Sequence, residues 1–220
     1  MSWHLRREME KLNRSVLEMS ARVEQAVLDA ARAFLNRDAE LADQIIERDR
    51  RIDHQEMEIA EEGLKILALY QPVARDLRFI YSLGKISGIL ERIGDLAENL
   101  ARKGKSLNRW AAVAIPEDFS PMAEQVRGML KNGIDSLIER DPKKAAEVIK
   151  ADREVNQAKR DIRKAAESAL QAAPAAFPQW LIIVAASRNL ERIGDLAANI
   201  AAEVVYCEEG RIARHGFDCE

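Results

Sequence analysis

The sequence contains few of the residues that build disulfide-bonded or β-rich proteins. It has two cysteines, Cys207 and Cys219, which form neither a disulfide framework nor a CxxC zinc site and indicate a reducing cytosol. It has only 10 glycines, 6 prolines and 5% aromatic residues. The low content of glycine, proline and aromatic residues, together with 47% hydrophobic residues, argues against both a β-sandwich and a disordered chain.

Long hydrophobic runs and a strong net charge are also absent. The longest apolar run, WLIIVAA at 180–186, is too short to span about 30 Å of hydrocarbon, and the first residues, MSWHLRREME, lack a signal-peptide core. The net charge is −3, with 34 basic and 37 acidic residues spread along the chain, which gives no footprint for nucleic acid or an anionic membrane. We therefore expect a cytoplasmic protein.

Motifs of common enzyme classes are missing as well. The sequence has no GxGxxG and no GxxxxGK[ST] motif, so no motif indicates a nucleotide-binding function. Its histidines, His4, His54 and His215, form no HExxH or ExxH motif, and we do not expect His215 in the tail to bind metal. We expect no enzymatic activity.

What the sequence does contain is helical periodicity interrupted by few breakers. Apolar residues at helical spacing predict helices over 2–36, 38–69 and from about 72 to 107, followed by 118–139, a turn at Asp141-Pro142, a helix to about 172, a break at Pro174 and Pro178, and a helix to about 208. Isoleucines spaced seven apart (Ile45, Ile52, Ile59, Ile66) and the similarly spaced Val148, Val155 and Ile162 indicate seams against neighbouring helices.

These helices predict an all-α fold made of a tandem repeat of two three-helix bundles. Short turns between long helices favour an up-down-up arrangement in each half. We expect the first repeat to cover 1–108, a linker 109–117, the second repeat 118–209 and a C-terminal tail 210–220.

One string occurs twice, as LERIGDLAENLA at 90–101 and LERIGDLAANIA at 190–201. The first and fourth predicted helices show no comparable repetition, so duplication alone does not explain it. On a helix, Glu91, Asp95 and Asn99 share one side, with Glu98 beside them, opposite an apolar side of Ile93, Leu96 and Leu100. Glu191, Asp195 and Asn199 repeat this arrangement in the second copy.

Carboxylates one helical turn apart can converge on one hard cation or bridge two. A second acidic pair, Asp49 and Asp53, precedes the first copy, and Asp152 and Asn156 hold the corresponding places in the second half. If the two helices of each half are neighbours, each half brings together four side-chain oxygen donors. The alternative is an ordinary solvated acidic face, with Asp49 and Asp53 paired to nearby arginines.

The repeated string resembles the signature segments of the PhoU family, as do PVARDLRFI at 72–80 and VVYCEEGRIARH at 204–215. The resemblance implies a usually dimeric, cytosolic negative regulator of phosphate uptake and phosphate-starvation signalling. Such a protein acts between a high-affinity phosphate ABC transporter and a sensor histidine kinase, and reaches the membrane only through these partners.

The resemblance also implies a multinuclear metal site, with iron or zinc expected and other divalent cations as alternatives, bound through (D/E)xxxD motifs. Asn156 departs from the family pattern, so we predict two unequal sites. The implied ligands are Asp49, Asp53, Glu91, Asp95, Asp152, Glu191 and Asp195, with Asn99, Asn199, Asn156 and Glu98 as secondary candidates.

Two other functions remain open from the sequence. One is a carboxylate-bridged di-iron enzyme or metal store, which long acidic helices also build, although the Glu-x-x-His motif of such sites is missing. The other is a helical scaffold that binds no ligand.

Overall fold

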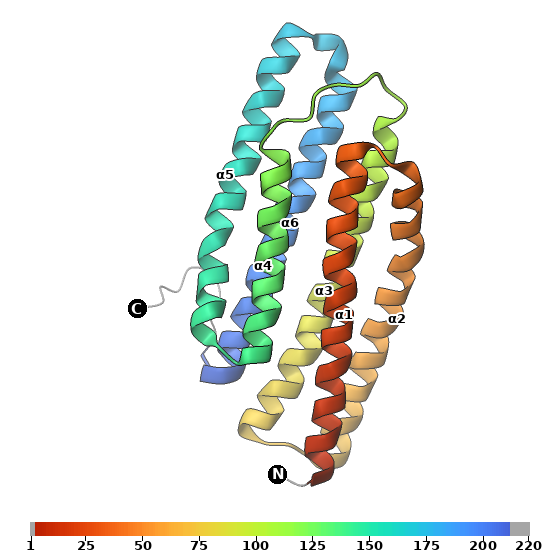
Figure 1. The fold of residues 1–220 in the computed structure, drawn as a ribbon. Helices are drawn as coiled ribbons and strands as arrows, with labels where there is room; N and C mark the ends of the chain where they lie inside the picture. The colour runs from red at the N-terminus through yellow and green to blue at the C-terminus, as the bar shows by residue number, and fades with distance from the viewer. Residues whose placement is uncertain (1–2, 212–220) are drawn as a thin grey trace.

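The computed structural model describes residues 3–211, which form six long helices and one short 3-10 helix and no β-strand (Figure 1). The predicted all-α fold is therefore confirmed; His215 and Cys219, with most of the predicted tail, lie outside the described residues. Within 3–211, no helix is both long and apolar enough to cross a membrane. The elements are α1 Trp3–Asn36, α2 Ala39–Tyr70, α3 Ala74–Leu107, α4 Phe119–Glu139, α5 Pro142–Ala172, η1 Pro174–Ala176 and α6 Phe177–Glu209.

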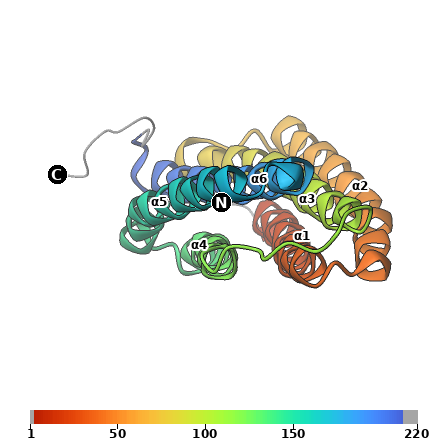
Figure 2. The ribbon, with the colours of Figure 1, turned by 90° about the horizontal axis from the view of Figure 1, so that it is seen from above.

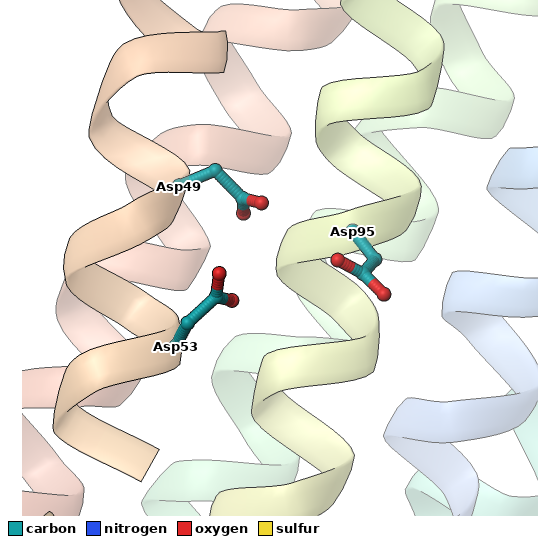
Figure 3. Close-up of side chains that lie close together, drawn as sticks. All are labelled: Asp49, Asp53 and Asp95. Atoms are coloured by element: carbon teal, nitrogen blue, oxygen red, sulfur yellow. The ribbon is translucent and has the colours of Figure 1, made fainter. Parts of the chain in front are cut away.

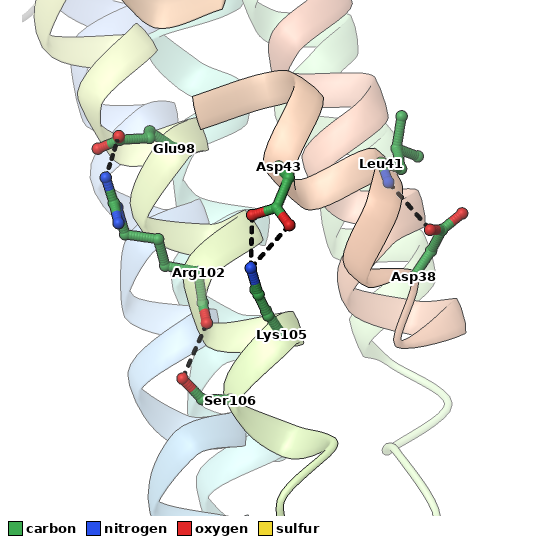
Figure 4. Close-up of polar contacts among 7 residues, drawn as sticks. All are labelled: Asp38, Leu41, Asp43, Glu98, Arg102, Lys105 and Ser106. Atoms are coloured by element: carbon green, nitrogen blue, oxygen red, sulfur yellow. Dashed lines mark hydrogen bonds and ion pairs between the residues drawn. The ribbon is translucent and has the colours of Figure 1, made fainter. Parts of the chain in front are cut away.

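Aspartates cap the helices where the sequence predicted helix starts. The Asp38 side chain accepts a hydrogen bond from the Leu41 backbone N–H at 3.0 Å and so begins α2 (Figure 4). Asp141 caps α5 in the same way, and Pro142 occupies the first turn, where its missing N–H costs nothing. The prediction for Pro178 was wrong: the chain breaks at Pro174, in η1, and Pro178 lies in the first turn of α6.

The helices lie in two layers. Seen from above, α5, α6, α3 and α2 form a row, and α4 and α1 cover one side of it (Figure 2). Helix α1 packs against α2, α3 and α4, while α4 packs against α5 and α6. The two helices that carry the repeated string, α3 and α6, pack against each other in the middle of the row.

One continuous apolar core runs through both halves. The predicted seams are buried, since Ile52 is 3% exposed and Val155 fully buried. The apolar side of the repeated string is buried at Ile93 and Leu100, but Leu96 is only partly buried, because it faces the groove between α3 and α6. The limits of the two predicted repeats stay a prediction, because this shared core crosses from one half to the other.

Two glycines of α3 allow close approach of neighbouring helices. A Cβ atom at Gly104 would lie 2.8 Å from the Cα of Phe34 on α1, and one at Gly94 would lie 3.0 Å from Asp49 Oδ1 on α2. At Gly104 a larger residue would therefore push α1 and α3 apart, whereas at Gly94 the side chains of Asp49 and Ile52 would have to move by a few tenths of an ångström. Gly94 thus allows α3 to lie close to the acidic part of α2.

Candidate metal site

Three aspartates from two helices come together in the first half of the chain. Asp49 and Asp53 project from α2 toward α3, which carries Asp95 (Figure 3). Each offers one carboxylate oxygen, and these three oxygens all lie within 4.8 Å of one another. Small movements of side chains would bring them onto one hard cation, which prefers several carboxylate oxygens at 2.0–2.6 Å. The structure thus brings together two sequence segments that were predicted to meet only if their helices are neighbours.

The local sequence explains this convergence. Asp49 and Asp53 stand one turn apart on the edge of the buried Ile45, Ile52 and Ile59 stripe, so packing of that stripe turns both carboxylates toward α3. Asp49 is itself 9% exposed, whereas Asp95 is exposed. The site therefore has a buried inner end and an open outer end.

The electrostatics are those of crowded carboxylates. Burial, followed by the charges of Asp53, Glu98, Asp95 and Glu91, raises the pKa of Asp49 from 3.8 to about 7. Burial and neighbouring carboxylates also raise the pKa of Glu91 and of Asp95. A bound cation would relieve this repulsion.

Among the described residues, no protein cation forms an ion pair with four carboxylates of this cluster, although the charge of Arg92 acts to lower the pKa of Glu91. Within residues 3–211, Asp49, Asp53, Glu91 and Asp95 make no side-chain hydrogen bond and no ion pair. The nearby Glu98 is different, because Arg102 donates to it at 2.6 Å (Figure 4). Glu98 is thus already paired with Arg102, and it remains at most a secondary candidate for a metal ligand.

Glu91 is the candidate that the structure does not bring into the three-aspartate group. It lies on the same side of α3, one turn from Asp95, and its charge reaches Asp49. Its role as a ligand stays a prediction, because its side chain would have to change rotamer to join the three aspartates. Further along α3, Asn99 faces the groove beside α6.

The corresponding residues of the second half are arranged differently. The Asn156 side-chain amide donates to Asp152 Oδ2 at 2.7 Å, whereas the buried Asp152 Oδ1 has no hydrogen-bond partner. The Lys159 ammonium group donates to Glu191. Burial, followed by the charges of Asp152 and Glu191, raises the pKa of Asp195 to about 6, and burial also raises that of Asp152. In the described part of the chain, only the first-half group has three carboxylates with such close oxygens.

A groove of about 530 Å³ runs between the two copies of the repeated string. Sequence periodicity could not reveal it, because periodicity identifies the apolar side of a helix but not its neighbour. Its lining is nearly symmetric and consists of Arg92, Asp95, Leu96 and Asn99 from α3 and Arg192, Asp195, Leu196 and Asn199 from α6.

Two further charged residues near these acids were not predicted from the sequence. Glu56 contributes to the raised pKa of Glu91, and Lys159 pairs with Glu191. Comparing charged residues of both signs between the two halves, rather than the acids alone, would have found them. No histidine joins either set, and His54 instead lies 3.4 Å from Glu58, so the Glu-x-x-His arrangement of di-iron enzymes is not built from the described residues.

Comparison with known proteins matches two segments of the chain to the same family. The model of the PhoU domain matches twice, at residues 16–104 and 119–204. A Pseudomonas aeruginosa protein named phosphate-specific transport system accessory protein PhoU homolog is 35% identical over 216 residues, covering 94% of this chain and 86% of that protein. A Zymomonas mobilis protein of the same name is 33% identical, covering 89% of this chain and 83% of that protein.

Solved structures agree with the sequence relatives. The crystal structure of PhoU from Pseudomonas aeruginosa has a TM-score of 0.90 at 34% identity, covering 94% of this chain and 99% of that one. The phosphate transport system regulatory protein PhoU from Streptococcus pneumoniae has a TM-score of 0.88 at 25% identity, with 96% and 100% covered. These relatives are accessory and regulatory proteins rather than enzymes. The chain belongs to the PhoU domain family.

Proposed function

We propose that this protein is a cytoplasmic negative regulator of phosphate uptake and of phosphate-starvation signalling. The observation that carries the proposal is similarity along nearly the whole chain to proteins named as accessory and regulatory parts of the phosphate transport system. The protein acts as an adaptor between a phosphate ABC transporter and a sensor histidine kinase, as a homodimer. Its long exposed helix faces are suited to docking on proteins.

Deletion of the gene tests the regulatory role. In phosphate-rich medium, the deletion strain should express a phosphate-starvation reporter at a level close to that of starved wild-type cells. Reintroduction of the intact gene should restore repression. Unchanged reporter expression in the deletion strain would refute the regulatory proposal.

Direct association needs a separate measurement. The purified protein should bind the purified transporter ATPase subunit or the cytoplasmic part of the kinase in a titration followed by light scattering. Light scattering of the protein alone should give the mass of two chains. Absence of binding to both partners would contradict the adaptor role.

We also propose that Asp49, Asp53, Asp95 and Glu91 hold iron or zinc. The donor set supports a hard cation at this place, because four carboxylates without an ion pair to a protein cation form an oxygen-rich, negatively charged site. When bound, the metal supplies positive charge that links α2 to α3. The chain's own residues contribute the orientation: α2 fixes the spacing of Asp49 and Asp53, and Gly94 allows α3 to approach.

Metal analysis of protein purified without chelator tests this part. The wild-type chain should retain at least about one iron or zinc ion after desalting, and Asp49→Ala/Asp95→Ala should lose it. Glu61→Ala, an exposed acid on the same helix, is the matched control and should retain the ion. Equal metal content in all three proteins would refute the site.

A further inference from the structure

The buried seams of α2 and α5 show which residues of the two halves correspond, independently of the acidic residues. Ile45, Ile52 and Ile59 of α2 correspond in spacing and burial to Val148, Val155 and Ile162 of α5. The same register places Asp152 at the position of Asp49, Asn156 at that of Asp53 and Lys159 at that of Glu56. On α6, Glu191, Asp195 and Ala198 correspond to Glu91, Asp95 and Glu98.

Charge differs sharply between the two equivalent sets. The first half has six carboxylates at these positions. The second half has three carboxylates, two uncharged side chains and one ammonium group. Three substitutions make the difference: Asn156 in place of Asp53, Lys159 in place of Glu56, and Ala198 in place of Glu98. Crowding of like charge, which favours cation binding in the first half, is therefore much weaker in the second.

The contacts differ in the same direction. In the second half, Lys159 donates a hydrogen bond to Glu191, and both side chains are partly buried, at 31% and 18% exposed. Asn156 donates to Asp152, so at this position the amide supplies a hydrogen-bond donor in place of a carboxylate ligand. The charge of Asp152 raises the pKa of Asp195, and the buried Asp152 Oδ1 has no hydrogen-bond partner. Two of the three acids of this set, Asp152 and Glu191, therefore already have a protein partner.

From these contacts we propose that the Lys159 ammonium group supplies, in the second half, the positive charge that a metal ion supplies in the first, so that of these two equivalent places only the one between α2 and α3 binds metal. This inference rests on the proposed metal function of the first-half site. A divalent cation entering between α5 and α6 would meet two carboxylates, Asp152 and Asp195, in place of three, and it would lie near the positive charge of Lys159, which acts on both. Repulsion between two cations at a few ångströms opposes this strongly.

The consequence is an asymmetric molecule built from a nearly symmetric repeat. The α2–α3 side can gain or lose a metal ion, whereas the α5–α6 side carries a fixed internal cation. Metal availability can therefore alter the α2–α3 side of the molecule, but not the α5–α6 side across the α3–α6 groove.

A pair of reciprocal variants tests the proposal. Asn156→Asp/Lys159→Glu gives the second half the charges of the first, and Asp53→Asn/Glu56→Lys gives the first half the charges of the second. Each protein is loaded with Zn²⁺, desalted and analysed for zinc per chain. The first variant should hold about twice the zinc of the wild type, and the second should hold almost none.

Three results would overturn the inference in distinguishable ways. Zinc bound equally in both halves of the wild type, located by anomalous scattering, would refute the role of Lys159 and leave the metal proposal intact. Wild-type protein without zinc would refute the metal proposal itself. An unchanged zinc content in a folded Asn156→Asp/Lys159→Glu protein would show that these residues do not exclude the metal.

A single substitution guards against a reciprocal variant that does not fold. Lys159→Gln removes the charge, keeps a hydrogen-bond donor at the end of the side chain and shortens it by one atom. Without metal, it should lower the thermal midpoint measured by circular dichroism, and Zn²⁺ should raise that midpoint more than it does in the Lys159→Gln/Asp195→Asn protein. An equal zinc-induced shift in both proteins would contradict the proposal.

Discussion

At the residue scale, the aspartates of the first-half site were predictable and their surroundings were not. Asp49, Asp53 and Asp95 follow from acidic pairs one turn apart on helices that a short turn makes neighbours. The pairing of Glu98 with Arg102 and of Glu191 with Lys159 depends on side-chain reach, which sequence spacing does not fix. The single acidic difference inside the repeated string, Glu98 against Ala198, therefore matters together with Asp53 against Asn156 and Glu56 against Lys159.

Asp49 should make the stability of the metal-free protein depend on pH. Its pKa in the folded protein is raised to about 7 from 3.8, so the folded state binds a proton that the unfolded state releases between these values. This contribution is complete below about pH 4 and is lost as pH rises through about 7. With solvent screening, we expect a loss of about 1–2 kcal/mol between pH 5 and pH 8.

Urea unfolding in the presence of a chelator at pH 5 and pH 8 measures this effect. Asp49→Asn should reduce the difference between the two pH values, and Glu61→Gln, on the same helix but exposed, should leave it unchanged. A wild-type protein that is more stable at pH 8 than at pH 5 would contradict the assignment.

At the element scale, the long helices were predicted almost to their ends because aspartate caps and prolines mark them. The observed ends of α2 and α6, at Tyr70 and Glu209, each lie one residue beyond the prediction. Pro178 was misinterpreted because a proline in a first helical turn and a proline that ends a helix look alike in sequence. Leu96 was assigned to the core because periodicity does not show that a groove opens beside α6.

The close contact of α2 with α3 should be sensitive to one methyl group. Gly94→Ala would place a Cβ 3.0 Å from Asp49 Oδ1 and 3.2 Å from Ile52, so we expect a loss of about 1–3 kcal/mol of unfolding free energy and weaker metal binding. Gly194→Ala is the matched control in α6, where the nearest atom lies 3.4 Å away. There the gain in helix propensity, up to about 1 kcal/mol, should offset the contact.

Thermal unfolding of both variants, with and without Zn²⁺, separates packing from metal binding. The account requires that Gly94→Ala reduce both the thermal midpoint and its increase on zinc addition. If Gly194→Ala proved the more damaging of the two, the assignment of the tight contact to α2 and α3 would be wrong.

At the scale of the whole molecule, the two repeats share one core through the contact of α3 with α6. Sequence periodicity predicted six helices in two groups of three, but not which helices join the groups. The rings of Phe34 on α1 and Phe119 on α4 stack with their centroids 4.6 Å apart, and Asn189 of α6 donates to the Leu96 carbonyl oxygen of α3 at 3.3 Å, so side-chain contacts also tie the halves together.

This shared core predicts that the halves unfold together. Differential scanning calorimetry of the metal-free protein should show one cooperative transition. Two transitions of similar enthalpy, well separated in temperature, would instead mean that each repeat is stable alone, as the predicted boundaries at 108 and 118 allow.

The central claim is that this member of the PhoU domain family binds metal on one side of its repeat only. The most direct measurement is anomalous diffraction from a crystal of the zinc-loaded wild-type protein. The account predicts density among Asp49, Asp53 and Asp95, with the Lys159–Glu191 pair intact and no metal beside Asp152 and Asp195. Comparable metal density at both places, or at the second alone, would contradict it.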